Sequence, residues 1–157
     1  MKLMFASDIH GSLPATERVL ERFAQSGARW LVILGDVLNH GPRNALPEGY
    51  VDQMLLHFPI TAPWQQILTQ ERRLFLTHGH LFGPTNLPAL HTGDVLVYGH
   101  THLPVAQQQE GLYHFNPGSV SIPKGGYAAS YGILDDNVLS VIALNDQSII
   151  AQVAINS

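Results

Sequence analysis

The stretch that decides the fold is KLMFASDIHGSLPATERVLERFAQSGARWLVILGD, residues 2–36. Residues 2–6 form an apolar run typical of a strand. Residues 13–25 carry apolar side chains at helical spacing, and Ser12 stands before them as a potential N-cap. The continuous apolar run of residues 29–34 is typical of a strand buried on both faces. The stretch therefore predicts a strand–helix–strand unit whose two strands are parallel neighbours.

The rest of the chain predicts mostly short strands. Candidates are residues 73–77, 95–98, 105–107 and 112–115, and the C-terminal part reads as strands joined by tight turns at residues 135–137 and 145–148. Residues 39–50 contain two Gly and two Pro and predict a loop. The segment that follows this loop shows neither a second helix nor a third apolar strand.

Asp and His residues follow four of the predicted strands at the point where each strand ends. SDIHG follows the first strand, GD the second, HGH the strand of residues 73–77, and GHTH that of residues 95–98. Ligands bind at the carboxyl ends of strands in open α/β sheets. Each motif alone fits a turn or a surface loop, but four in the same structural position indicate one site. Its candidate residues are Asp8, His10, Asp36, His78, His80, His100 and His102.

These residue types point to metal chemistry. His100 and His102 can face one point if the backbone stays extended past Gly99. Carboxylates and imidazoles without sulfur suit Mn²⁺, Zn²⁺, Fe or Mg²⁺. Six candidate ligands, which are these residues without His80, are too many for one ion and about right for two if Asp36 bridges them. Two such ions clamp a phosphoryl group and generate hydroxide as the nucleophile near neutral pH.

Composition sets further limits. The 157 residues, 45% of them hydrophobic, fit a single globular domain over residues 1–157. A net charge of −4 with only 8 Lys and Arg argues against nucleic acid as a partner. The absence of cysteine excludes disulfides and thiolate ligands. The N-terminus turns polar too soon for a signal peptide and no apolar run reaches about 18 residues, so we expect no membrane segment and a cytoplasmic location.

The motifs DIH, GD, HGH and GHTH, in this order and at strand ends, resemble those of the calcineurin-like metallophosphoesterases. The resemblance covers essentially the whole chain, including FNPGSVSIPKGG at residues 115–126, and is strongest to the small bacterial phosphodiesterases of that family. It implies an α/β fold, namely a four-layer α/β/β/α sandwich of two mixed sheets. It also implies two divalent metal ions, most often Mn²⁺, and hydrolysis of a small phosphodiester substrate.

Carried over position by position, the resemblance also implies a role for each residue. The ligands of the first metal would be Asp8, His10, Asp36 and His102. The protein ligands of the second metal would be Asp36, His78 and His100. His80 or His40, at the rim, could protonate the leaving oxygen, and Asn39 would line the mouth of the site. Residues 116–119 fit a structural turn below the site.

One motif of the family is missing. The family places Gly-Asn, followed by His or Cys and an acid, between its GD and HGH motifs, and this Asn binds the second metal. No Gly-Asn occurs in this sequence. The family also has a helix and a strand in this interval, whereas here Tyr50 runs directly into Val51. We therefore expect a fold that lacks one helix–strand unit after Tyr50.

Two functions follow from these residues. The first is a metal-dependent phosphodiesterase in which two metals activate the attacking hydroxide. The alternative is a catalytically weak or inactive scaffold of the same fold, which the missing ligand favours. Neither a membrane nor nucleic acid is expected as a partner, and the C-terminal edge strands could pair two chains in a homo-oligomer.

Three explanations of the gap after Tyr50 are open: a segment omitted from the printed chain, an internal deletion in the gene, or a natural short form with a weakened second site. We favour the first, because losing an inner strand would expose two sheet edges and much of the core. We therefore expect the intact mass of the purified protein to exceed 17.2 kDa by a few kDa. A measured mass of 17.2 kDa would show that the gap is real.

Overall fold

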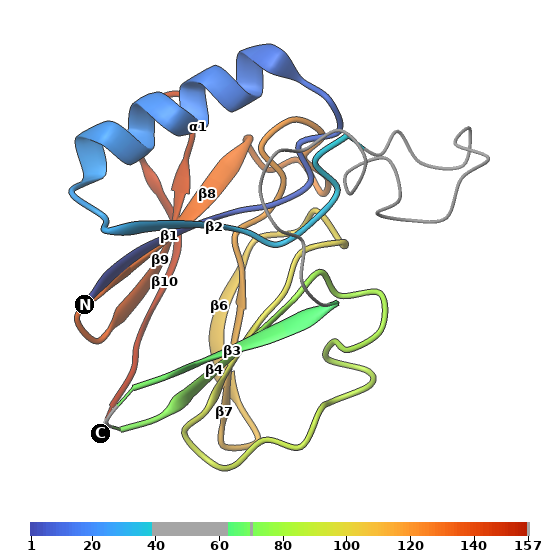
Figure 1. Ribbon diagram of the computed structural model, residues 1–157, viewed down its shortest axis with the longest axis vertical. Coiled ribbons are helices and arrows are strands. Elements are labelled where there is room, and N and C mark those ends of the chain that lie inside the picture. Colours follow the sequence, from blue (N-terminus) through green and yellow to red (C-terminus); the bar gives the residue numbers. More distant parts are fainter. Residues whose placement is uncertain (39–62, 70, 157) are drawn as a thin grey trace.

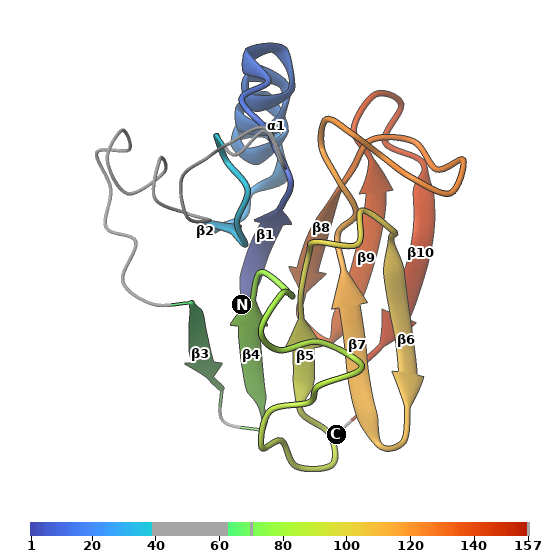
Figure 2. The same cartoon turned by 90° about the vertical axis from the view of Figure 1, so that its right-hand side faces the viewer.

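The computed structural model describes residues 1–38, 63–69 and 71–156, and these form one helix and ten strands. The elements are β1 (Lys2–Ala6), α1 (Leu13–Ser26), β2 (Trp30–Ile33), β3 (Trp64–Leu68), β4 (Arg73–Thr77), β5 (Val95–Val97), β6 (Val105–Gln109), β7 (Leu112–Asn116), β8 (Ser130–Asp135), β9 (Val138–Ala143) and β10 (Ile149–Ala154). The strand order is β10-β9-β8-β1-β2 in one sheet and β3-β4-β5-β7-β6 in the other. Both sheets contain parallel and antiparallel pairs, and they pack face to face (Figures 1 and 2).

The predicted strand–helix–strand unit is confirmed. β1 and β2 are parallel neighbours, with Leu3 opposite Trp30. Ser12 caps α1, because its side chain accepts a hydrogen bond from the backbone N–H of Ala15 at 3.3 Å. Gly27 ends the helix in the left-handed conformation, with φ of 71°.

Two apolar layers follow from the alternation of side chains along β1. Leu3 and Phe5 point into the core between the two sheets, where they meet residues such as Phe115. Met4 and Ala6 point the other way, into a second cluster that includes side chains of α1. The helix therefore covers the outer face of the first sheet, as Figure 1 shows.

The predicted sandwich of two mixed sheets is confirmed. On the outer face of the second sheet, Phe75, Leu96 and Tyr98 form a third apolar cluster. Among the described residues, no helix covers this cluster. Phe82 and Leu90, from the irregular segment between β4 and β5, pack against it instead. This arrangement agrees with the expectation that the chain lacks part of the four-layer fold.

The prediction that residues 29–34 are buried on both faces is wrong. β2 is the edge strand of its sheet, and Trp30 is 58% exposed. Its apolar sequence is that of an inner strand, yet no described strand pairs with its outer edge. The sequence prediction also missed β3, a strand with two Gln that pairs with β4 and with no other described strand. A groove of about 470 Å³ between β2 and β3 extends to His78.

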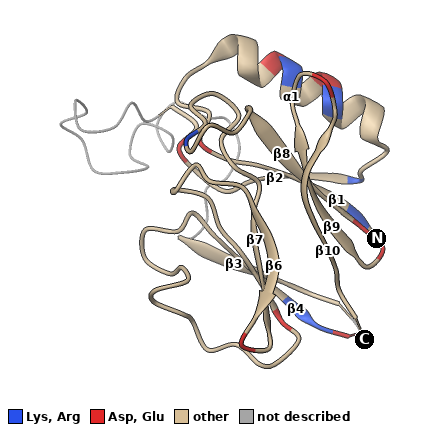
Figure 3. Ribbon diagram, turned by 180° about the vertical axis from the view of Figure 1, so that it is seen from behind, with Lys and Arg blue, Asp and Glu red and all other residues tan. Residues whose placement is uncertain are grey.

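Charged residues are spread over the surface of the described part of the chain. Figure 3 shows Lys, Arg, Asp and Glu mainly on α1 and near the chain ends, with both signs mixed. Such a surface offers no continuous basic face to a polyanion. Among the described residues, no helix has the length and apolar character needed to cross a membrane.

Asp94 joins β4 to β5 at the end of the second sheet where both strands begin. Its carboxylate accepts hydrogen bonds from the backbone N–H and guanidinium of Arg73 and from the backbone N–H of His91, at 2.9–3.1 Å. Burial alone would raise the pKa of Asp94. The backbone hydrogen bonds from His91 and Arg73, together with the Arg73 guanidinium, outweigh burial and hold that pKa below its ordinary value.

We expect Asp94→Asn to lower the free energy of unfolding by about 1–3 kcal/mol at pH 7, because the charged acceptor is lost. The folded-state pKa lies below the unfolded one, so the ionised carboxylate stabilises the fold at neutral pH. The difference from wild type should shrink as the pH falls below about 4. Urea unfolding at several pH values measures this difference in the free energy of unfolding. Asp136→Asn, in an exposed hairpin turn, is the control, and a cost that does not change with pH would contradict the account.

Candidate metal centre

Strands from both sheets end in the same region of the sandwich (Figure 1). β1 and β2 are parallel in one sheet, and β4 and β5 are parallel in the other. Backbone pairing continues past the strand ends. The N–H of Asp8 donates to the carbonyl of Gly35 at 3.2 Å, and the N–H of Gly99 donates to the backbone carbonyl of His78 at 2.7 Å. The segments that follow these strands are therefore held side by side.

Five predicted ligands meet there. They are Asp8, His10, Asp36, His78 and His102, and each side chain is at most 11% exposed. Asp8 Oδ1 lies 3.2 Å from His102 Nε2 and 3.8 Å from His10 Nε2. Asp36 Oδ2 lies 3.6 Å from His10 Nε2 and 3.4 Å from His78 Nε2.

Two groups of three ligands can be distinguished within this cluster. One contains Asp8, His10 and His102, and the other contains Asp8, Asp36 and His78. Within each group the potential ligand atoms all lie within 4.8 Å of one another. Asp8 belongs to both groups, and Asp36 is close to histidines of both.

The donor set fits a divalent cation. Asp8 Oδ1 is buried and accepts no hydrogen bond from any described residue, while Asp8 Oδ2 accepts one from the backbone N–H of His100 at 3.1 Å. His102 Nδ1 donates to the carbonyl of Ile122 at 2.6 Å, which orients the ring with Nε2 toward the centre. The buried carboxylate of Asp8 is costly without a positive partner. Oxygen and imidazole nitrogen donors suit Mn²⁺, Zn²⁺, Fe or Mg²⁺.

The backbone of the centre is strained. Asp8, His10, Asp36, His100 and His102 all have φ between 50° and 64°, the left-handed region. This conformation costs roughly 1–2 kcal/mol per residue, although Asp and His adopt it more readily than most residues do. The other described non-glycine residues with positive φ lie in turns. Strain concentrated in this way is typical of functional sites.

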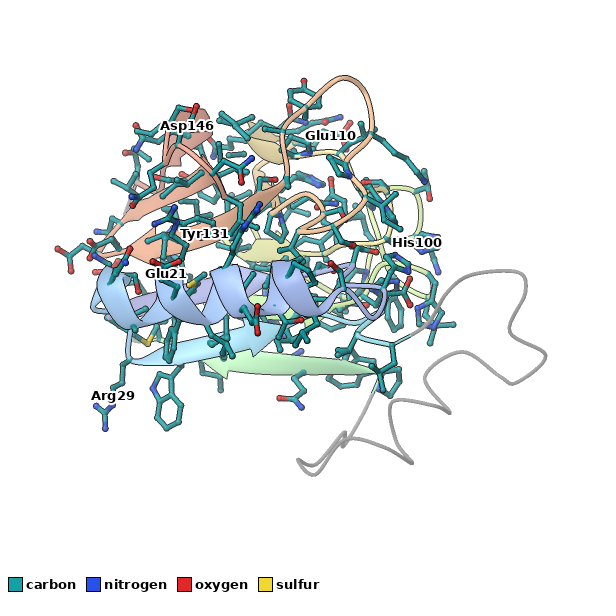
Figure 4. All side chains as sticks on the ribbon, turned by 90° about the horizontal axis from the view of Figure 1, so that it is seen from above. Glu21, Arg29, His100, Glu110, Tyr131 and Asp146 are labelled. Atoms are coloured by element: carbon teal, nitrogen blue, oxygen red, sulfur yellow. The ribbon has the colours of Figure 1, made fainter. Side chains whose placement is uncertain are left out.

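The expected extended backbone after Gly99 is wrong, and the left-handed turns separate the two histidines. His102 is buried in the centre, whereas His100 is exposed, with its ring 5.2 Å from that of His78. Exposed His80 lies beside both, at ring distances of 5.7 Å from His78 and 6.5 Å from His100. Figure 4 places His100 at one end of the sandwich, away from Asp146. Asn39 and His40 lie outside the described residues.

Two glycines allow the close approach of these segments. A Cβ on Gly99 would overlap Ser7 Oγ and lie 2.8 Å from Asp8 Oδ2. A Cβ on Gly35 would lie 2.6 Å from His78 Nδ1, and the φ of Gly35 is +144°, a value that L-residues rarely adopt. Both positions therefore require glycine if the ligands are to keep their places.

The turn that was predicted below the site also contacts it. Asn116 Nδ2 donates to the carbonyl of Gly99 at 2.9 Å and to Thr101 Oγ1 at 3.0 Å. It thereby holds the segment that carries His100 and His102. The sequence prediction missed the hydroxyls of Ser119 and Ser121, which contact the backbone of Asp8. No spacing rule links residues more than a hundred positions apart, so the sequence carried no signal for this contact.

We expect Gly35→Ala to weaken Mn²⁺ binding by about 10-fold or more, because the added methyl displaces the His78 ring. Gly27→Ala is the matched control. Gly27 also has positive φ, but no atom lies within 4 Å of its added Cβ. The control should therefore lose some stability and no Mn²⁺ affinity. Titration calorimetry measures both variants, and unchanged binding by folded Gly35→Ala would contradict the described His78 environment.

Comparisons with known proteins agree with this geometry. Residues 1–137 match the calcineurin-like phosphoesterase superfamily domain. The chain is 74% identical to phosphodiesterase YfcE of Escherichia coli, covering 99% of both sequences. The solved structure of this Escherichia coli phosphoesterase has a TM-score of 0.92 and covers 99% of this chain and 100% of its own. Vps29 of Entamoeba histolytica, solved with Zn²⁺, shares the fold at 18% identity and a TM-score of 0.64, covering 99% and 100% of the two chains.

The comparison with YfcE also bears on the missing unit. Its alignment runs over 182 positions whereas this chain has 157 residues, so at least 25 positions of the relative face no residue here. This number is enough for a helix followed by a strand. The size of the gap agrees with the unit that we predict to be lost after Tyr50.

Proposed function

The chain belongs to the calcineurin-like phosphoesterase superfamily, and from this premise we propose that residues 1–157 act as one domain that hydrolyses small phosphodiesters with divalent metal ions. It is a phosphoric ester hydrolase by its family and by its 74% identity to a bacterial phosphodiesterase. The observation that carries the proposal is the cluster of two carboxylates and three imidazoles at the strand ends, in which each side chain is at most 11% exposed.

We propose two cation positions in this cluster. Asp8, His10, Asp36 and His102 would hold the first, and Asp36, His78 and His100 would hold the second. When bound, such ions supply Lewis-acid activation of water and neutralise charge on the phosphoryl group. Mn²⁺ is the proposed metal, since the donors are oxygen and imidazole nitrogen without sulfur. The exposure of His100 suits a position at the substrate side of the centre.

The protein's own groups have two further tasks in this proposal. The carboxylates and imidazoles, held by strained backbone, keep fixed positions, so little reorganisation accompanies the reaction. We propose that His80, which is exposed and lies beside His78 and His100, gives a proton to the leaving oxygen. The corresponding roles of Asn39 and His40 stay predictions from the sequence.

A scaffold function is the alternative, and one observation favours it. The sequence lacks the Gly-Asn motif, and at least 25 of the 182 positions in the alignment with YfcE face none of the 157 residues here. A centre without that Asn would hold its second ion weakly. A folded protein that binds partners without turnover would fit this deficiency.

Location and assembly complete the proposal. We propose a cytoplasmic enzyme, which cell fractionation tests. β10 is an edge strand and could pair two chains, which gel filtration tests. The mixed surface charges do not favour nucleic acid as a partner.

We expect hydrolysis of bis(p-nitrophenyl) phosphate when Mn²⁺ is present and none after treatment with EDTA. Asp36→Asn should lower kcat/KM by more than about 100-fold, since loss of a ligand exceeds the 10–100-fold cost of losing an outer partner. Asp136→Asn, the same exchange in an exposed turn, should leave the rate unchanged. A folded wild type that shows no Mn²⁺-dependent turnover would overturn the proposal and favour the scaffold.

A further inference from the structure

A single hydroxyl connects two metal ligands that come from different sheets. Ser119 is fully buried and lies between β7 and β8. Its Oγ donates to the backbone carbonyl of Asp8 at 2.9 Å and accepts from the backbone N–H of Ile122 at 2.9 Å. The carbonyl of Ile122 in turn accepts the 2.6 Å hydrogen bond from His102 Nδ1. Three hydrogen bonds therefore join Asp8 to His102 through Ser119.

The hydrogen bond from Ser119 to Asp8 stabilises a left-handed stretch of backbone. Asp8 has φ of 56°, so it leaves the strand conformation of β1 directly before the centre. Its carbonyl accepts two hydroxyl hydrogen bonds, from Ser119 and from Ser121, each at 2.9 Å. These bonds satisfy a carbonyl that the strand ladder no longer pairs, and they stabilise the left-handed conformation.

The contact through Ile122 fixes the imidazole. A carbonyl can only accept a hydrogen bond, so His102 must carry its proton on Nδ1 and present Nε2 to the centre. The position of this carbonyl depends on the backbone N–H of Ile122, which Ser119 holds. Loss of the Ser119 hydroxyl would therefore loosen both ligands at once.

We propose that Ser119 is a positioning residue of the first metal site and that Ser121 supports it. The turn that contains them contacts both ligands, whose Asp8 Oδ1 and His102 Nε2 atoms lie 3.2 Å apart. This inference rests on the proposed function only in that a divalent cation occupies this centre. It requires no particular substrate.

Ser130 provides a matched control in the same region. It is also fully buried, and its hydroxyl donates to the carbonyl of Pro117 at 2.7 Å. This hydrogen bond lies within the turn itself and reaches neither Asp8 nor His102. Ser130→Ala therefore removes a buried hydrogen bond of the turn without removing one from a ligand.

The test measures Mn²⁺ binding to the full chain by titration calorimetry, together with the Tm without metal. We expect Ser119→Ala to weaken Mn²⁺ binding by about 10–100-fold. Ser130→Ala should lower the Tm without metal and change Mn²⁺ affinity less than about twofold, because a purely structural loss does not reach the ligands. Equal weakening in both variants, or unchanged affinity in Ser119→Ala, would overturn the inference.

A second pair of variants decides the matter if Ser119→Ala does not fold. Ser121 is only partly buried, so Ser121→Ala removes one of the two donors to Asp8 and Ser121→Thr keeps it. The alanine variant should bind Mn²⁺ several-fold more weakly and the threonine variant should restore binding; equal affinities would reject the inference. The Mn²⁺ titration contains no substrate, so its result does not depend on whether the protein hydrolyses phosphodiesters. A wild type that binds no Mn²⁺ rejects the metal proposal itself.

Discussion

The buried carboxylate of Asp8 is the group on which both sheets converge. The backbone N–H of Asp8 donates to the carbonyl of Gly35 in the first sheet. The backbone carbonyl of Asp8 accepts hydrogen bonds from the hydroxyls of Ser119 and Ser121. One carboxylate oxygen accepts the N–H of His100 from the second sheet, and the other faces the imidazoles. Every polar group of this residue is thus assigned either to holding the sheets together or to binding a cation.

This arrangement costs folding free energy, and in the folded protein it keeps the side chains close together for a cation. Five left-handed residues and the buried carboxylate of Asp8 oppose folding when no cation is bound. A cation at the centre offsets the charge and binds only the folded arrangement, so metal binding and stability are coupled. The apolar core between the sheets, built from side chains such as Phe5 and Phe115, is what keeps these groups in place.

The two proposed cation positions draw on different parts of the chain. Asp8, His10 and His102 meet at strand ends that the described fold retains. The second position would draw on the Asn of the missing motif, and no described strand pairs with the outer edge of β2. The exposed Trp30 and the groove beside His78 lie along that edge. A missing Asn would therefore weaken the second position, while the described hydrogen bonds to Asp8 and His102 support the first.

Interactions between residues close in sequence determine much of the fold that the sequence predicts. The cap at Ser12, the stop at Gly27 and the period-two pattern of β1 act within a few residues, so the strand–helix–strand unit could be read directly. Placement of Asp and His after successive strands predicted a shared centre, because ligands bind at the carboxyl ends of strands in α/β sheets. Only the tertiary structure decided that Trp30 is exposed, that His102 rather than His100 is buried, and that Ser119 supports Asp8. These features depend on contacts between distant segments and on backbone turns, which residue spacing along one chain does not encode.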